Sequence, residues 1–506
     1  MRFTRRSVLR SGGAGAAGAA LLGAAAAPRA ARAQLGDDVT RGALLVVLPL
    51  VRADYVKAFE GGSGTKTPNL NHLTDKSLRF DRAIPESMPA LSTRRALVTG
   101  MRAFPFRDWR RTDGMPAIPG FNPVWNYQPL MTEAMRAGGV ETVYITDNPM
   151  LDGPRFPDVR RTSAALERGT TSTPGIETEL LPSFKRLSRA AETTYAEGIR
   201  ALRRMRRGAA FFVAVDPFDP RDAYEAPPVY VKPDKVEDEG LGDMNGRLLA
   251  LDFSDDQIDR VRDAYRDHVE TVDKWLGRLM DEVPSGTVVY ALGDHGISLG
   301  EHAYLGRAAP TSHRLSYEVP YLIRHPSGQR GGDDIDWYAS THDVAPTLLS
   351  FLGLTIPGKM DGEDLTALFD DVDQDDLPDR DKSVTAVASN IIIRDRRWLV
   401  IADRQKIERR MYDDDEKVED NITRFDNIAN EDPGKLTELS LAAVNLAGGT
   451  LPEFGPDGAL RPHIERGDDD RDDDGIPNDF DAVDNDEEKD GVEPGDVKFD
   501  GRKPNG

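Results

Sequence analysis

The stretch Leu44-Leu45-Val46-Val47-Leu48-Pro49-Leu50-Val51-Arg52-Ala53-Asp54 decides the fold. Residues 43–48 form a short, unbroken apolar run, which is typical of a strand that is buried on both faces of a sheet. A proline and then the charged segment Arg52-Ala53-Asp54 end the run. The sequence therefore predicts that the chain leaves a buried sheet at this point.

Strands and helices alternate through the middle of the chain. The apolar pattern predicts three more strands, over residues 142–146, 209–215 and 287–292. It also predicts helices that start at Thr67-Pro68 and Thr93, and longer ones over residues 128–137 and 256–280. Such alternation is typical of a mostly parallel sheet with helices on both faces, and ligands of such sheets bind beyond the carboxyl ends of the strands. We therefore expect a site in the loops after Leu48, Val215 and Leu292.

The pattern changes near the C-terminus. Short strands are predicted over residues 384–387, 391–393, 398–402 and 409–412, which indicates a small antiparallel subdomain. We therefore predict a main α/β domain over residues 40–370, the subdomain over residues 371–445 and an acidic tail over residues 446–506.

Composition excludes several classes of protein. The chain has 506 residues, a formal net charge of −22 and no cysteine. The negative charge argues against non-specific nucleic-acid binding, which depends on lysine and arginine. The lack of cysteine excludes a disulfide framework and a cysteine-derived nucleophile.

The N-terminus has the features of an export signal. Arg5-Arg6 is a twin arginine, an Ala/Gly/Leu-rich stretch follows, and Ala31-Arg32-Ala33 is an A-x-A cleavage site. Residues 1–33 are thus predicted to be a twin-arginine signal peptide, with Gln34 as the first mature residue. The alternative is a membrane anchor, although the apolar stretch is short for a spanning helix. The predicted location is the periplasm, the cell surface or the medium, with no transmembrane segment once the signal is removed.

Five motifs occur in one order along the chain. After Arg52-Ala53-Asp54 come Thr67-Pro68-Asn69-Leu70, the segment Leu91–Gly100, Gly293-Asp294-His295-Gly296 with Leu299-Gly300-Glu301-His302, and Asp343-Val344-Ala345-Pro346-Thr347-Leu348-Leu349. In this order and spacing, the set resembles the sulfatase family of the alkaline-phosphatase superfamily, over roughly residues 40 to 420. The resemblance implies an alkaline-phosphatase-like α/β fold and the hydrolysis of sulfuric or phosphoric esters with a divalent cation and a covalent nucleophile.

Three functions that this chemistry needs fall on residues that cannot perform them. The resemblance puts the metal-binding positions of the first strand at Pro49 and Leu50, which offer no side-chain oxygen to a hard cation. It puts the nucleophile at Ala90, whose methyl group cannot attack sulfur or phosphorus. It puts the family's histidine at Arg221, which stays charged and cannot exchange a proton near neutral pH.

Other residues of the motifs leave two interpretations open. Ser92 and Thr93 are hydroxyls beside the missing nucleophile, and they are either capping residues of a helix or divergent catalytic groups. Asp54 is a capping or surface carboxylate rather than a ligand. Asp294 and His295 are either the remains of the family's metal site or structural residues, with His295 donating to a carbonyl.

Three arginines keep positive charge at the expected site. Arg94, Arg221 and Arg307 match or replace family residues that face the substrate anion, and guanidinium groups suit sulfate and phosphate. The leading hypothesis is thus an exported pseudoenzyme that binds a sulfated or phosphorylated small molecule or polysaccharide, or that acts as a surface scaffold. The alternative is an active ester hydrolase with a divergent nucleophile (Ser92 or Thr93) and a metal held by Asp294 and His295.

The tail carries a separate motif. Residues 466–506 hold 16 acidic and 6 basic residues, and residues 470–481 place oxygen-bearing side chains at alternating positions before a glycine. This segment resembles a thrombospondin type 3 repeat, which implies calcium binding. The expected Ca²⁺ ligands are Asp470, Asp472, Asp474, Asn478 and Asp481. The alternatives are a solvated acidic extension and a cell-surface assembly protein whose main active element is this tail.

Overall fold

The computed structural model describes the main domain and the core of the small subdomain. The described residues are 42–59, 64–88, 90–106, 108–109, 112, 119–162, 176, 180–205, 209–219, 229–231, 248–250, 253–301, 304–306, 317–369, 380–387, 390–403, 409–413, 432–447, 453–454 and 460–461. The predicted signal peptide, Arg221, Arg307 and the tail residues predicted to bind calcium lie outside them.

An eight-stranded sheet forms the centre of the molecule. Its strand order is β13-β2-β12-β9-β1-β6-β4-β5. Neighbouring strands run parallel except at β12, which is antiparallel to both β2 and β9. The strands are β1 (Gly42–Leu48), β2 (Leu78–Ala83), β4 (Glu141–Thr146), β5 (Val159–Arg160), β6 (Phe211–Asp216), β9 (Thr287–Gly293), β12 (Tyr321–Arg324) and β13 (Asp334–Ala339). The predicted mostly parallel α/β architecture is confirmed.

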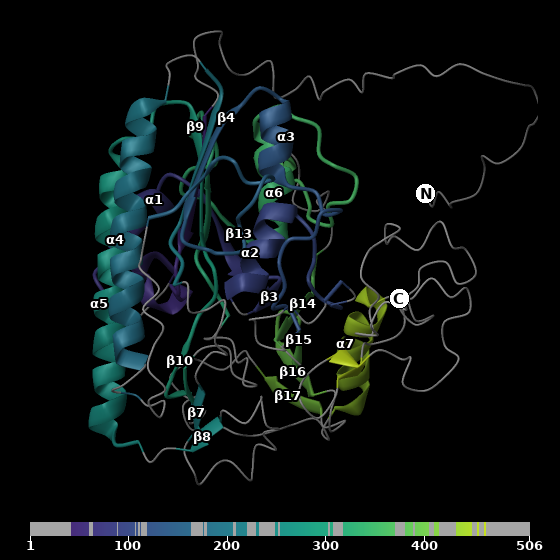
Figure 1. The fold of residues 1–506 in the computed structure, drawn as a ribbon. Coiled ribbons are helices and arrows are strands. Elements are labelled where there is room, and N and C mark those ends of the chain that lie inside the picture. Colours follow the sequence, from purple (N-terminus) through teal and green to yellow (C-terminus); the bar gives the residue numbers. More distant parts are fainter. Residues whose placement is uncertain are drawn as a thin grey trace, which may run out of the picture.

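Helices cover both faces of this sheet, as Figure 1 shows. The helices α4 (Leu181–Arg204) and α5 (Asp255–Met280) lie on one face, and α2 (Ala90–Thr99), α3 (Met131–Ala137) and α6 (Val344–Phe351) lie on the other. Side chains of a strand alternate between faces, so the apolar run of β1 serves both layers. Its even-numbered residues 44, 46 and 48 join the core under α4 and α5, while residues 43, 45 and 47 join the core under α2, α3 and α6.

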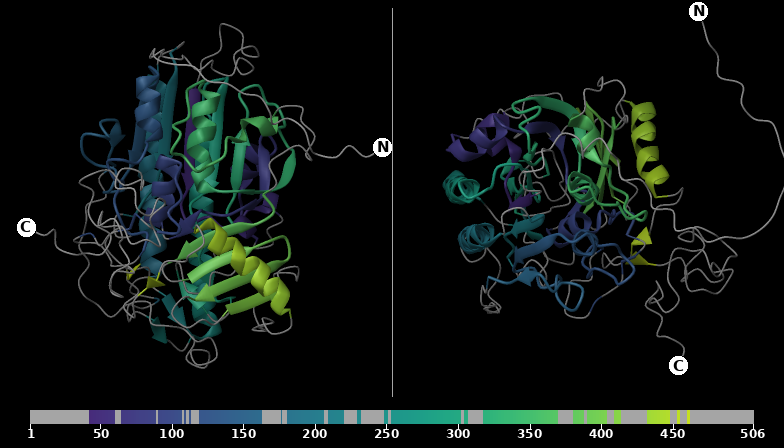
Figure 2. Two further views of the ribbon diagram at one scale, coloured as in Figure 1. Left: turned by 90° about the vertical axis from the view of Figure 1, so that its right-hand side faces the viewer. Right: turned by 90° about the horizontal axis from the view of Figure 1, so that it is seen from above.

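A smaller sheet lies at one end of the main sheet (Figure 1). Its order is β17-β16-β15-β14-β3, and the four C-terminal strands form an antiparallel meander. Figure 2 shows α7 (Pro433–Leu446) crossing one face of it, where Leu439 and Ala443 join its apolar core. The strands are β3 (Ser87–Met88), β14 (Ser383–Val387), β15 (Asn390–Arg394), β16 (Trp398–Asp403) and β17 (Arg409–Asp413).

Short elements complete the described structure. Strands β7 (Val229–Val231), β8 (Leu248–Ala250), β10 (Ser298–Leu299) and β11 (Tyr304–Gly306) form one sheet, and β18 (Glu453–Phe454) pairs with β19 (Leu460–Arg461). The remaining helices are α1 (Pro68–Thr74) and the 3-10 turns η1 (Ala53–Tyr55), η2 (Lys57–Phe59), η8 (Thr341–Asp343) and η9 (Leu365–Phe369). None of the helices in the described part of the chain is both long enough and apolar enough to span a bilayer.

The structure departs from the predicted elements in several places, and β2, β12, β13, α6 and α7 are among the elements that were not predicted. Helix α2 begins at Ala90, three residues before the predicted start. Thr67 precedes α1, but its side chain makes no cap hydrogen bond with the helix backbone; its Oγ1 instead lies 3.4 Å from the Lys57 amide and from Asn71 Oδ1. Helix α4 was not predicted, although its buried residues, such as Leu187, Ala191 and Tyr195, recur at helical spacing.

Candidate functional site

The strand ends that were expected to form a site do meet. β1 is the central partner of both β6 and β9, with Val46 opposite Val215 and Leu48 opposite Gly293. Because all three strands run parallel, their carboxyl ends lie at the same edge of the sheet. Pro49 and Leu50 follow β1, Asp216 ends β6, and Asp294 follows β9. The site therefore combines two apolar residues with two carboxylates.

Arg94 lies between the two carboxylates. Its Nε donates to Asp216 Oδ1 at 2.8 Å, and its Nη1 donates to Asp294 Oδ2 at 2.8 Å. Two backbone carbonyls complete the set, because Nη1 also donates to Ala90 O at 3.2 Å and Nη2 donates to Pro217 O at 2.8 Å. The guanidinium group thus uses its nitrogens on protein oxygens and is only 1% exposed.

Burial and charge pairing act in opposite directions in this cluster. Burial holds the pKa of Asp216 above its ordinary value of 3.8, although Arg94 lowers it. Burial alone would raise the pKa of Asp294, but the Arg94 guanidinium and the Leu50 amide outweigh it, and the net pKa lies below the ordinary value of 3.8. Burial lowers the pKa of Arg94, yet the attraction of Asp216 and Asp294 raises it above its ordinary range. Arg94 is therefore a permanent cation here, and Asp294 is its anionic partner.

The first strand ends in a tight loop that closes over Asp294. Leu50 has a positive φ of 57°, and its amide donates to Asp294 Oδ1 at 2.6 Å. Tyr265 of α5 donates its hydroxyl to the Leu50 carbonyl at 2.8 Å, and His268 Nε2 lies 2.8 Å from the Pro49 carbonyl. Asp294 thus accepts a hydrogen bond from the Leu50 amide with one oxygen and from the Arg94 guanidinium with the other.

The residues near the expected nucleophile position are buried. Ala90 is the first residue of α2 and is 2% exposed, while Ser92 and Thr93 are fully buried. Ser92 Oγ lies 2.6 Å from Ser87 Oγ, and Thr93 Oγ1 donates to the Ser87 carbonyl at 2.6 Å. Both hydroxyls therefore join the start of α2 to β3, and neither caps the helix as the sequence pattern had suggested.

His295 and Asp54 also have protein partners. His295 is 2% exposed, with its Nδ1 2.8 Å from the Gly296 carbonyl, which fits the structural interpretation of this histidine. Asp54 pairs with the buried Arg52 at 2.7 Å, and Arg52 Nη1 also contacts Glu301 at 3.0 Å. The Asp54 side chain is 29% exposed, and it is therefore a partly exposed member of an ion cluster around the buried Arg52 rather than a free surface carboxylate.

The residues of the described structure do not fit the family's divalent cation. Pro49 and Leu50 provide no oxygen-bearing side chain, and both oxygens of Asp294 are already bonded. Within the described residues, no group of three or more His, Cys, Asp or Glu side chains is arranged to hold a metal ion. A hard cation such as Ca²⁺ takes six to eight oxygen ligands, which is more than this arrangement leaves free.

Sequence reasoning missed Asp216, Tyr265 and Glu301 as members of these clusters. Asp216 is fully buried, and it accepts hydrogen bonds from Arg94 on one oxygen and from the Tyr144 hydroxyl, at 3.0 Å, on the other. One signal was available, since Asp216 is a carboxylate directly after the predicted strand that ends at Val215. The predicted anion ligands Arg221 and Arg307 lie outside the described residues. Asp219, two residues before Arg221, is buried and accepts a hydrogen bond from Arg186 at 3.2 Å.

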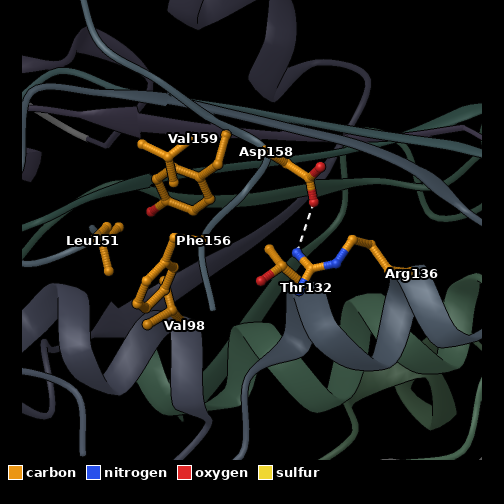
Figure 3. Close-up of a pocket in the computed structure, with 8 residues that line it drawn as sticks. Val98, Thr132, Arg136, Leu151, Phe156, Asp158 and Val159 are labelled. Atoms are coloured by element: carbon orange, nitrogen blue, oxygen red, sulfur yellow. Dashed lines mark hydrogen bonds and ion pairs between the residues drawn. The ribbon is translucent and has the colours of Figure 1, made fainter. Parts of the chain in front are cut away.

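Tyr144, which donates a hydrogen bond to Asp216, also lines a small pocket. Figure 3 shows its walls, in which Val98, Leu151 and Phe156 face the paired Arg136 and Asp158. The Arg136–Asp158 distance is 2.7 Å, and the pocket encloses about 10 Å³. That space is enough for at most one water molecule, so this pocket is not a substrate site.

Comparisons with known proteins agree with the fold. A family model described as Sulfatase matches residues 43–354. The chain is 22% identical over 404 residues to the "Multifunctional alkaline phosphatase superfamily protein PehA" of Trinickia caryophylli, which is 64% of this chain and 76% of that protein. It is 29% identical over 133 residues to the N-acetylglucosamine-6-O-sulfatase of Bacteroides thetaiotaomicron, which is 24% of this chain but only 22% of that enzyme.

The solved structures extend the likeness to most of the chain. A 2-O GAG sulfatase superposes with a TM-score of 0.62 at 15% identity, over 81% of this chain and 92% of that chain. At this identity the superposition supports the fold and does not carry the activity over.

Proposed function

Because the chain belongs to the sulfatase family, we propose that it is an exported family member that binds a sulfated or phosphorylated ligand, or serves as a surface scaffold, without cleaving an ester. One observation carries the proposal. The first residue of α2, where the resemblance puts the nucleophile, is Ala90, and the neighbouring hydroxyls of Ser92 and Thr93 are fully buried in hydrogen bonds to Ser87. A methyl group forms no covalent ester intermediate.

The alternative of an active hydrolase finds less support in these contacts. Ser92 would have to break its 2.6 Å contact with Ser87 and reach solvent from a position where it is 0% exposed. Catalytic residues that act together lose most of their effect when one of them is missing. Because the nucleophile, the metal ligands and the histidine are all replaced, the family mechanism is lost.

The proposed ligand follows from the remaining positive charge. Arg94 is already neutralised by Asp216 and Asp294. We therefore assign the ligand's anionic group to Arg221 and Arg307. A sulfated sugar is the first candidate, because the curated relative from Bacteroides thetaiotaomicron is named for N-acetylglucosamine 6-O-sulfate. The net charge of −22 opposes the approach of an anion, so binding is expected to be modest and to weaken with salt.

The test is binding without turnover. Purified mature protein is expected to bind N-acetylglucosamine 6-sulfate in calorimetry and to release no sulfate from it, or from an aryl sulfate, with or without added Ca²⁺ or Mn²⁺. The variant Arg307→Ala is expected to bind about tenfold or more weakly, which corresponds to the loss of one charge-assisted contact of about 1.5–3 kcal/mol. Arg79→Ala is the matched control, because Arg79 is a surface residue paired with Asp81 and is expected to leave binding unchanged.

Two outcomes would contradict the proposal. Sulfate release that disappears in the Ser92→Ala variant would make the chain a hydrolase with a divergent nucleophile. Equal binding by the wild type and Arg307→Ala would remove Arg307 from the ligand site, and the absence of binding by both would contradict the ligand-binding function.

The tail adds a calcium-dependent element to this proposal. Asp470, Asp472, Asp474, Asn478 and Asp481 are spaced as oxygen ligands around a turn at Gly475. We expect Ca²⁺ at roughly 10⁻⁴ to 10⁻³ M to protect residues 466–506 from a protease, which is the affinity range of extracellular modules. A double change of Asp472 and Asp474 to Asn is expected to abolish the protection while the main domain stays folded. Equal rates of tail cleavage with chelator and with millimolar Ca²⁺ would show that the tail is only a solvating extension.

A further inference from the structure

The oxygens around Arg94 form the kind of cage that proteins build for a cation. Four acceptors surround the guanidinium: one carboxylate oxygen each from Asp216 and Asp294, and the carbonyl oxygens of Ala90 and Pro217. Carboxylates and backbone carbonyls are also the ligands that Ca²⁺ prefers. The acceptors come from the ends of β6 and β9 and from the start of α2, so they join three separate elements.

An aromatic ring also lies against the Arg94 guanidinium group. Arg94 Cζ lies 4.8 Å from the centroid of Phe218, a distance at which a ring face attracts a cation. Arg94 is 1% exposed and Asp216 is fully buried. Two carboxylates at this depth would repel each other if no cation lay between them, and one of them would then tend to take up a proton. The positive charge of Arg94 lowers the pKa of both carboxyl groups and so favours their ionised forms.

We propose that the Arg94 guanidinium is the resident cation of this strand-end site and takes the structural place of a divalent metal ion. It neutralises Asp216 and Asp294, holds the ends of β6 and β9 against the start of α2, and cannot dissociate because it is part of the chain. The folded protein then needs no divalent ion at this site. This inference rests on the proposed function in one respect, namely that the site holds no catalytic metal.

The inference is tested by removing the guanidinium group. The variant Arg94→Ala leaves the two carboxylates and two carbonyls as a vacant set of oxygens. We expect its thermal midpoint in EDTA to fall by roughly 5 °C or more, and Ca²⁺ to recover part of that loss as its concentration rises. A guanidinium is broader than a bare ion, so the oxygens must move inward, and an apparent dissociation constant of roughly 10⁻⁴ to 10⁻³ M is expected.

Arg95→Ala is the matched control. Arg95 is on the same helix, is 4% exposed and pairs with a carboxylate, but among the described residues that carboxylate is Asp108 alone, at 2.7 Å. Its loss is expected to lower the midpoint without any recovery by Ca²⁺. All variants are made in the full chain with Asp472 and Asp474 changed to Asn, so that calcium binding by the tail does not contribute. Arg94→Gln is the second test variant, and we expect it to gain from Ca²⁺ as Arg94→Ala does.

Several results would overturn the inference. A lower thermal midpoint of the wild type in EDTA would show that the fold needs a divalent ion. Equal stabilisation of Arg94→Ala and Arg95→Ala by Ca²⁺ would show that the oxygens around position 94 cannot accept an ion. A failure of both Arg94 variants to fold even with Ca²⁺ would show that an ion cannot replace the guanidinium. Sulfate release by the wild type would contradict the proposed function but would leave these stability results as they are, so the two failures can be told apart.

Discussion

Replacing Arg52 with methionine is expected to lower the free energy of unfolding by about 3–5 kcal/mol, the usual loss when one partner of a buried ion cluster is removed. Arg52 is 1% exposed and contacts Asp54 at 2.7 Å and Glu301 at 3.0 Å, while its Nη1 also donates to the Ile297 carbonyl at 2.8 Å. Methionine preserves an unbranched stem but leaves both carboxylates without a counter-charge. Urea unfolding followed by circular dichroism measures the loss.

Arg266→Met is the control for this experiment. Arg266 also pairs with an aspartate, Asp263, at 2.6 Å, but its side chain is 37% exposed and that of Asp263 is 66% exposed. Surface pairs of this kind contribute about 0–1 kcal/mol. Equal losses for Arg52→Met and Arg266→Met would show that burial does not strengthen the Arg52 cluster.

The pH dependence of the Arg52 cluster provides a second measurement of the same effect. Burial raises the pKa of Glu301, but Arg52 and backbone amides outweigh it, so the net pKa lies below 4.5 in the folded protein. A carboxyl with a lowered pKa contributes stability that is complete above its unfolded pKa and is lost as the pH falls through its folded pKa. The acid loss of stability due to Glu301 should therefore shrink in Arg52→Met, because the pKa of Glu301 then rises.

The position of the site was predictable from sequence because it depends on local patterns. The apolar run before Pro49 and the strand before Gly293 each mark a buried strand, and parallel strands bring such ends together. Ala90 was placed at the site by the resemblance to the sulfatase family and not by the strand pattern. Strand prediction succeeded in the small sheet as well, where the observed β14 to β17 differ from the predicted ranges by one residue or less at each end.

The partners of the site residues could not be predicted, because they are set by tertiary packing. Arg94 is 122 residues from Asp216 and 200 residues from Asp294, and no local pattern links them. The sequence indicated that Arg94 would face an anionic ligand, whereas in the structure it faces the protein's own carboxylates. β3 is similar: a strand of two residues, Ser87–Met88, has no detectable pattern, yet it joins the small sheet to the start of α2.

The loop that follows α6 supports α2 from its other end. Helix α2 stops at Thr99, and the Gly100 carbonyl accepts hydrogen bonds from the amides of Asp361 at 2.8 Å and Gly362 at 3.0 Å. Since α2 also carries Ala90 and Arg94, this contact fixes the helix that provides the centre of the site. The geometry at Gly362 is therefore important for the whole strand-end arrangement.

Gly362→Ala is expected to lower the free energy of unfolding by about 3 kcal/mol or more, at the upper end of the range for overpacking. A Cβ atom at Gly362 would lie 2.0 Å from the His342 carbonyl oxygen and 3.0 Å from Asp343 Cα, which are backbone atoms of η8 and cannot rotate away as a side chain could. Asp343 is itself held by Arg380 at 2.6 Å, so η8 has little freedom to shift. Gly358→Ala is the control, because no atom of the described residues lies within 4 Å of its Cβ position, and it is expected to change stability by less than about 0.5 kcal/mol. Urea midpoints that agree for the two variants would mean that η8 yields to the added methyl group, and that α2 does not depend on close packing at this glycine.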